Sequence, residues 1–273
     1  MSYIGVTGFQ NVGEVKIISD HIDKYPVGKI MFGFTSSNKR LLDPTSSGKT
    51  SPALNDLGKL VAAVSSNHLP MIHYYTSSPD TLAEEVIALF KYTGIHPHIC
   101  GLQINQLWPD VSQIKRIVDF GQAAQIITLQ LPAQALDEGN YQIIEKLKAY
   151  EGLITCVLID PSGGLGVDFD VIRAAALMKL ISQKFKMIPG VAGGFSAENV
   201  ISRIIQIEDE TRCKCCQQAT LHDYCIDAQG KLREATEIKP IYPPDAPKIK
   251  KSSLSLIKTK NYIDNAINAL YSN

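Results

Sequence analysis

The chain has 273 residues, of which 45% are hydrophobic, and its 27 basic residues balance its 27 acidic residues. This length permits one large core without requiring a second domain, and the balanced charge gives no reason to expect nucleic acid or an anionic membrane as the main partner. No segment is long and apolar enough to span a bilayer, and the N-terminus lacks the basic and apolar regions of a signal peptide. We therefore expect a soluble, cytoplasmic protein.

Short apolar runs alternate along the chain with longer amphipathic runs, which is typical of parallel strands joined by helical crossovers. The expected strand and helix pairs are, in chain order, 3–8 with 12–24, 29–34 with 54–66, 70–75 with 79–92, 99–104 with 110–120, 125–131 with 140–150, 154–159 with 171–185, 187–192 with 197–208, and 223–227 with 254–270. Eight such pairs favour an α/β fold with a single (β/α)8 TIM barrel over residues 1–273, although a doubly wound open sheet shares the alternation. A Cys-bearing loop is expected at about 209–222, and a Lys/Pro-rich connection at about 238–252.

The sixth expected strand ends on a carboxylate, Asp160, and a glycine-rich loop with Gly163 and Gly164 follows it. In a TIM barrel the chemistry lies at the carboxyl ends of the strands. Because a carboxyl group there can be desolvated, Asp160 is a candidate general acid or base; the alternative is a carboxylate that only caps the glycine loop. Asp168 is placed to cap the helix that comes next.

Two further glycine turns follow the seventh and eighth expected strands, with Gly193 and Gly194 in the first and Gly230 in the second. In such barrels these turns commonly hold a phosphate with backbone N–H groups and a helix N-terminus. The pattern therefore predicts a site for a phosphorylated small molecule. The alternative for the first turn is an ordinary helix start with Ser196 as N-cap.

Polar side chains near the second and third strands are further candidates. Lys39 and Arg40 follow the second expected strand, where the guanidinium group of Arg40 could pair with a substrate carboxylate or phosphate; a solvated loop charge is the alternative. His73 and Tyr75 are two residues apart in the third strand and so share one of its faces. If that face is the barrel interior, both line the pocket; otherwise His73 packs in the core.

The four cysteines Cys213, Cys215, Cys216 and Cys225, together with His222, suggest a metal site at first. The spacing Cys-x-Cys-Cys has no second matched pair, however, so zinc is the less favoured alternative. We expect free thiols on an inserted loop, and we assign no metal and no cofactor.

Two of these segments together resemble phosphoribosylanthranilate isomerase, a (β/α)8 enzyme of the tryptophan pathway. The segment from Leu158 to Asp170 is similar to that family's strand-six Asp followed by Gly-Gly-x-Gly-x-x-Phe-Asp. The segment from Ala192 to Val200 is similar to its Ala-Gly-Gly-Leu-x-Pro-Glu-Asn-Val. Weaker similarities lie at 34–40, 103–105 and 226–230. The resemblance implies a ribulose-phosphate-binding type of barrel.

In that family an Amadori rearrangement opens the ribose ring of a phosphoribosyl compound. Matched residue by residue, the resemblance implies that Asp160 is the general acid and that Arg40 anchors the substrate. It also implies that Gly193 and Gly194 hold the phosphate.

The family's general base is a first-strand cysteine, and Thr7 stands in its position here. A threonine hydroxyl does not ionise near neutral pH and cannot take a proton as a thiolate can. Asp227 and His73 are the candidates to replace the thiolate. The family's fourth-strand His is also replaced, by Asn105.

We therefore expect an isomerase-like enzyme that binds a phosphoribosyl or other sugar-phosphate compound, with acid/base chemistry at Asp160. Two alternatives stay open: a different phosphosugar enzyme (an epimerase, lyase or hydrolase) on the same scaffold, and a non-catalytic sensor that kept the ligand site. The expected partner is a small phosphosugar, without nucleic acid, membrane or cofactor. A homodimer is compatible with a barrel, because barrels often pair through loops or helix faces.

Overall fold

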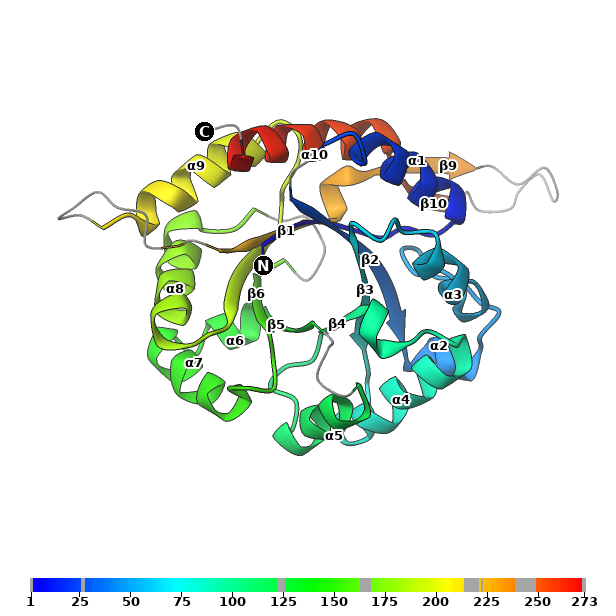
Figure 1. The fold of residues 1–273 in the computed structure, drawn as a ribbon, viewed down its shortest axis with the longest axis horizontal. Coiled ribbons are helices and arrows are strands. Elements are labelled where there is room, and N and C mark those ends of the chain that lie inside the picture. The colour runs from blue at the N-terminus through cyan, green and yellow to red at the C-terminus, as the bar shows by residue number, and fades with distance from the viewer. Residues whose placement is uncertain are drawn as a thin grey trace.

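Eight parallel strands, β1 to β8, close into a barrel in a computed structural model that describes residues 2–25, 28–121, 126–162, 168–213, 221, 223–238 and 249–271. The closure is made by β1 and β8, which pair in register with Ile4 beside Ile226 and Val6 beside Ala228. Figure 1 shows the ring of helices that surrounds the strands. The closed order confirms the TIM barrel and excludes the doubly wound open sheet.

The strands and helices alternate in the predicted order. The barrel strands are β1 (Tyr3–Thr7), β2 (Lys29–Ser37), β3 (Leu69–Tyr75), β4 (Gly101–Ile104), β5 (Ile127–Pro132), β6 (Cys156–Asp160), β7 (Ile188–Ala192) and β8 (Cys225–Ala228). The surrounding helices are α1 (Val12–Ile22), α3 (Leu54–Ala62), α4 (Leu82–Thr93), α5 (Val111–Gly121), α7 (Asn140–Leu147), α8 (Val171–Lys184), α9 (Val200–Thr211) and α10 (Leu256–Tyr271). Short helices not expected from the sequence are α2 (Asn38–Leu42) and α6 (Ala133–Leu136).

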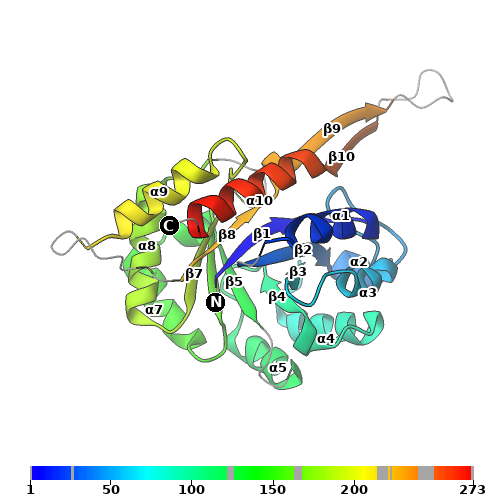
Figure 2. The same ribbon diagram turned by 45° about the horizontal axis from the view of Figure 1, so that its top comes forward.

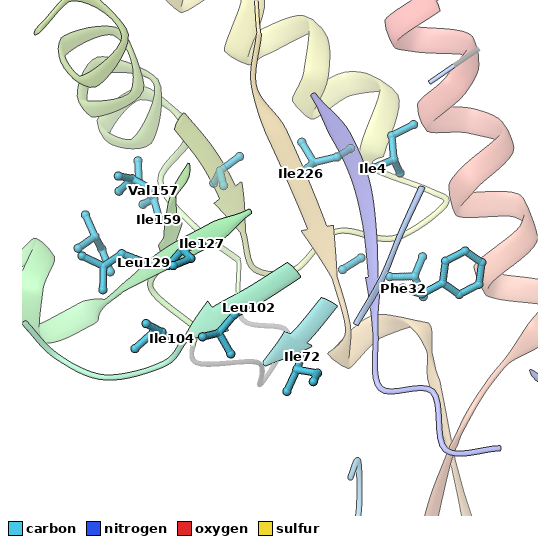
Figure 3. Close-up of a cluster of buried hydrophobic side chains, with 14 of the residues drawn as sticks. Ile4, Phe32, Ile72, Leu102, Ile104, Ile127, Leu129, Val157, Ile159 and Ile226 are labelled. Carbon is cyan, nitrogen blue, oxygen red and sulfur yellow. The ribbon is translucent and has the colours of Figure 1, made fainter. Parts of the chain in front are cut away.

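The main hydrophobic core lies between the outer face of the barrel and the helices. Alternate strand residues belong to it, and those labelled in Figure 3 are Ile4, Phe32, Ile72, Leu102, Ile104, Ile127, Leu129, Val157, Ile159 and Ile226. Successive side chains of a strand point to opposite faces, so the residues between these ten point into the barrel. This alternation puts Thr7, His73, Gln103, Asp160 and Asp227 on the inner face.

Strand β2 is longer than predicted, because it continues to Ser37 where a polar loop was expected after residue 34. The extension pairs Thr35, Ser36 and Ser37 with β3. Lys39 and Arg40 consequently lie in helix α2 rather than in a loop. The hydroxyl-bearing residues of this segment predict a loop. Thr is also common in strands, however, and the pairing with β3 supplies backbone partners for 35–37.

The connection predicted at 238–252 begins and ends in two antiparallel strands, β9 (Arg233–Ile238) and β10 (Ile249–Leu254). Its central part, 239–248, lies outside the described residues. Figure 2 shows this hairpin extending away from the barrel beside α10. The Lys/Pro-rich composition of this connection does not indicate the strands that lie on either side of the prolines.

The predicted helix cap at Asp168 is wrong, and a second helix starts later than predicted. Asp170, not Asp168, caps α8, because the helix starts at Val171 and an N-cap side chain accepts from the third helical residue, here the N–H of Arg173 at 3.1 Å. Helix α9 starts at Val200 and not at the predicted residue 197, so Asn199 takes the cap position that the alternative interpretation of the glycine turn gave to Ser196.

The predicted Cys-bearing loop starts late, since α9 continues to Thr211. Cys215, Cys216 and His222 lie outside the described residues. Within the described ranges no group of three His, Cys, Asp or Glu side chains is arranged to hold a metal ion. Among the helices of these same ranges, none is long and apolar enough to cross a membrane.

Candidate functional site at the carboxyl ends of the strands

A cavity of about 450 Å³ opens at the carboxyl ends of the barrel strands. Seven of the predicted site residues line it, namely His73, Asn105, Asp160, Gly193, Gly194, Asp227 and Gly230. Tyr75 lines it beside His73, as expected if their shared face is the barrel interior. Gly163 and Gly164 lie outside the described residues. The cavity is where a TIM barrel positions its ligands.

Asp160 is the last residue of β6 and is 4% exposed. One carboxylate oxygen, Oδ2, accepts a hydrogen bond from Gln130 Nε2 at 2.5 Å. The other, Oδ1, accepts from both the N–H (3.0 Å) and the hydroxyl (2.7 Å) of Ser162. These contacts fix the carboxylate at the cavity wall. The two contacts with Ser162 also cap the start of the glycine loop, which is the alternative role given above for Asp160.

Asp227 projects from β8 and is 6% exposed. The Thr7 hydroxyl on β1 lies 3.0 Å from Oδ1 and 3.1 Å from Oδ2, so it donates to this carboxyl group. Burial raises the pKa of Asp227 to about 7; the Thr7 hydrogen bond opposes this rise, and the negative charge of Asp160 adds to it. Asp227 can therefore exchange a proton near neutral pH.

Small residues make room for these groups. A Cβ on Gly5 would lie 2.7 Å from Asp227 Oδ1, and one on Gly33 would overlap the Thr7 hydroxyl. The same Gly33 Cβ would lie 3.0 Å from His73 Nε2. Glycine on β1 and β2 thus lets polar side chains of β1, β3 and β8 share the barrel interior.

His73 is 3% exposed, and burial lowers its pKa to about 3, so its imidazole is neutral at physiological pH. Nδ1 lies 3.1 Å from Gln103 Nε2, which can only donate, so Nδ1 accepts and the ring proton is on Nε2. Gln103 Nε2 also donates to Asn105 Oδ1 at 2.9 Å. In the described part of the chain His73 Nε2 has no hydrogen-bond partner.

The glycine turn after β7 has left-handed backbone geometry, with φ of 111° at Gly193 and 60° at Gly194. Arg203 of α9 holds this turn, because its Nη1 donates to the Gly193 carbonyl at 2.9 Å. The N–H groups of Gly194 and Gly230 donate to none of the described residues, and both glycines line the cavity. Unpaired N–H groups on two adjacent turns form a potential anion site.

Arg203 is itself fixed by three groups. Its guanidinium lies over the rings of Phe169 and Phe195, and Nη2 pairs with Asp168 at 2.8 Å. Lys231 Nζ contacts the same Asp168 oxygen at 2.8 Å. Asp168 therefore links the segments that follow β6, β7 and β8, a role that replaces its predicted capping.

Three predicted site residues do not line the cavity. Thr7 lies behind Asp227, to which it donates. Lys39 is exposed on α2, and the Arg40 guanidinium donates to the Ser46 hydroxyl in the loop after that helix. The structure thus brings the carboxyl groups and glycine turns together and leaves the predicted cationic anchor outside.

The sequence reasoning missed several residues of the site. Gln130 was not singled out, although a polar side chain within the buried run of β5 was a usable signal, and Gln103 was noted only for its resemblance to the family. Nothing in the local sequence marked Arg203, because its contacts come from segments distant in the chain.

No protein-family model matches the chain, and neither does any curated protein sequence. Solved structures do match. Phosphoribosyl anthranilate isomerase from Thermotoga maritima has a TM-score of 0.58 at 14% identity over 97% of this chain and 98% of its own. The enzyme of that name from Thermus thermophilus has a TM-score of 0.55 at 12% identity over 100% and 99%.

A GH18 chitinase from Pseudoalteromonas aurantia has a TM-score of 0.54 at 12% identity, over 84% of this chain and 94% of its own. Enzymes named for different activities thus match the chain about equally well. At these identities the matches show a shared barrel fold and no particular activity.

Proposed function

We propose that this protein is an enzyme that transfers protons on a phosphorylated sugar, in an aldose–ketose type of rearrangement. Asp227 is the general base, Asp160 is the second acid/base group, and the glycine turns hold the phosphate. The observation that carries the proposal is the pair of buried carboxyl groups in one cavity, one of them with a pKa of about 7. Such pairs, with a pKa near the working pH, suit acid/base catalysis.

The phosphate assignment is supported by position. Gly194 and Gly230 follow β7 and β8, the strands whose turns often bind phosphate in these barrels, and both N–H groups are unpaired in the described residues. Arg203 and Lys231 add positive charge behind the turns, although both also contact Asp168. A dianionic phosphate fits this edge better than the rest of the cavity wall.

The proton steps follow from the contacts. Ionised Asp227 takes the proton from the carbon next to the substrate's carbonyl or imine carbon, and the electron pair moves to form an enediol or enolamine. To the neutral imidazole of His73, whose Nε2–H has no partner in the described residues, we assign the hydrogen bond to the oxygen that gains charge, since a neutral imidazole can act as an electrophile. Transfer of the C2 hydroxyl proton to the oxygen on C1, together with return of the carbon-bound proton at C1, completes an isomerisation without a net change in protons.

In this proposal Asp227 replaces the thiolate of the resembling family, and Thr7 positions it instead of reacting. A raised pKa makes the ionised carboxylate a stronger base than an ordinary aspartate. Asp160, whose oxygens already accept three hydrogen bonds, delivers or receives the proton on the ring or hydroxyl oxygen.

The test is hydrogen exchange in D2O. Ribose 5-phosphate and phosphoribosylanthranilate are incubated with the protein, and NMR follows loss of the C2 proton and formation of ketose. We expect exchange with the wild type and a large loss with Asp160→Asn. Binding without exchange for either compound would refute the enzyme proposal and favour a sensor, and full exchange in Asp160→Asn would remove that residue from the chemistry.

The phosphate site has its own test. Gly194→Asp puts a negative charge at the turn, whereas Gly194→Asn has a similar shape and tolerates the same φ of 60°. We expect Gly194→Asp to weaken ribose 5-phosphate binding at least tenfold beyond the effect of Gly194→Asn, measured by calorimetry. Equal effects of the two substitutions would refute the phosphate assignment.

A further inference from the structure

One side of the cavity is formed by neutral hydrogen-bonding groups. This neutral half comes from the ends of β2 and β4 and the loop before α3, and its residues are Ser36, Ser37, Thr50, Ser51, Gln103 and Asn105. Asp160, Asp227 and the glycine turns line the other side. A substrate that extends from the phosphate across the carboxyl groups therefore reaches the neutral half with its far end.

Two buried polar atoms on the inner face of this region have no partner in the described part of the chain. These are Gln103 Oε1 and the adjoining His73 Nε2, and their residues are 2% and 3% exposed. The first is an acceptor and the second a donor. The amide and hydroxyl side chains that line this side likewise offer both donors and acceptors, so the region suits a ligand group that both donates and accepts hydrogen bonds.

Four cations near the mouth are paired with other groups, whereas Lys39 and Lys49 are exposed to solvent and are absent from the described lining. Arg40 donates to Ser46, and Arg203 and Lys231 pair with Asp168. Arg233 donates to the carbonyls of Gly8 and Lys49, both at 3.0 Å. No Lys or Arg is among the described residues that line the cavity, and the loop 163–167 carries no charged residue in its sequence.

Aromatic and apolar surface is also scarce in the cavity wall. Tyr75 is the aromatic residue of the described lining apart from His73, and it is 52% exposed at the rim. Pro132 and Ala192 are the apolar residues of the described lining. A flat ring with a carboxylate would therefore lose solvation without gaining a counter-ion or a stacking surface.

We propose that the neutral half binds an uncharged, hydroxyl-rich group, so that the substrate is a phosphosugar whose second part is a neutral polyol or sugar. This inference rests on the proposed function, because the phosphate at the glycine turns sets which end of the ligand enters the neutral half. Hydroxyl groups pair with amide and hydroxyl side chains as both donors and acceptors, which matches the residues present.

The experiment compares three phosphate esters by calorimetry with the full chain. Ribitol 5-phosphate has no second part, the glyceryl riboside of ribose 5-phosphate has a neutral polyol, and reduced 1-(o-carboxyphenylamino)-1-deoxyribulose 5-phosphate has a charged ring. We expect the glyceryl compound to bind at least tenfold more tightly than the other two. Tighter binding of the carboxyphenyl compound would overturn the inference and leave the proposed function standing.

Failure of ribitol 5-phosphate and of both other esters to bind would instead overturn the proposed function, and the inference with it.

A pair of variants at Ser37 provides a second measurement. Ser37→Arg adds a cation to the neutral half, and Ser37→Gln adds a neutral side chain of similar reach. We expect Ser37→Arg alone to improve binding of the carboxyphenyl compound by tenfold or more, and an equal gain with Ser37→Gln would count against the charge argument.

Discussion

The two ends of the barrel interior are built from the same strands but have opposite characters. The lower layer, at the amino ends, consists of Tyr3, Met31, Leu69, Met71, Cys156 and Cys225. The upper layer, at the carboxyl ends, consists of Thr7, His73, Gln103, Asp160 and Asp227. The lower layer is filled with apolar and sulfur-containing side chains, whereas the upper layer surrounds a cavity.

The difference is also one of ionisation. In the lower layer burial raises the pKa of the Cys225 thiol, so this thiol stays protonated and hydrogen-bonds to its neighbour Cys156. In the upper layer burial raises the pKa of Asp227 only to about 7, where both forms are populated at neutral pH. Buried polar groups normally lower stability, so their concentration at one end identifies the end where function is traded against stability.

The largest effect should come from removing the ionisable group of the upper layer. Asp227→Asn keeps the shape but cannot accept a proton, and general-base contributions are about 10²–10⁴-fold. We expect C2 exchange of ribose 5-phosphate to fall by about that factor while binding changes little. NMR exchange and calorimetry on the same samples measure both, and exchange within threefold of wild type would exclude Asp227 as the base.

The same substitution should show how much the ionisation of Asp227 lowers the free energy of unfolding. Folding raises the pKa of Asp227 from 3.8 to about 7, so the folded state binds this proton more tightly than the unfolded chain does. The resulting stability is complete below about pH 4 and is lost as the pH rises through 7. Three pKa units correspond to roughly 4 kcal/mol at most.

The asparagine side chain of the Asp227→Asn variant does not titrate. The free energy of unfolding of this variant should therefore rise relative to that of the wild type between pH 4 and 8. Urea unfolding at several pH values measures the difference between the two proteins. A difference that stays constant with pH would show that the Asp227 carboxyl titrates normally. That result would remove the contrast between the two layers.

The barrel could be predicted from the sequence because its outer face follows simple rules. Period-two apolar runs such as Ile127, Leu129 and Leu131 pack against helices, and each such run marked a strand. The carboxylate at the end of the sixth run was found in the same way, because strand ends in this fold converge on one opening. The glycines of the next two turns were found by composition.

The rest of the site depends on contacts that cross the barrel. Thr7 and Asp227 are 220 residues apart and meet only because β1 pairs with β8. Arg40 was a reasonable anchor by position, but a short helix at its own segment turns its guanidinium to Ser46. The local sequence does not indicate contacts between segments distant in the chain, so the environment of each carboxyl group could not be predicted.

A smaller effect is expected in the lower layer. Met71 is fully buried beside Gly101 and Thr128, and Met71→Ala should cost about 2–5 kcal/mol of stability, against less than about 1.5 kcal/mol for Met71→Leu. Urea unfolding measures both. If the layers are independent, ribose 5-phosphate binding to folded Met71→Ala stays within twofold of wild type, and a tenfold loss would show that they are coupled.

The smallest effect concerns the hydrogen bond within the upper layer. The Thr7 hydroxyl favours the ionised form of Asp227, so Thr7→Val should move the midpoint of the exchange rate, which rises with pH near 7, upward by about one unit. Thr7→Ser keeps the hydroxyl and should leave the midpoint in place. The pH profile of exchange measures all three proteins. A shift of the same size in both variants would mean that packing against Asp227, and not the hydrogen bond, sets its proton affinity.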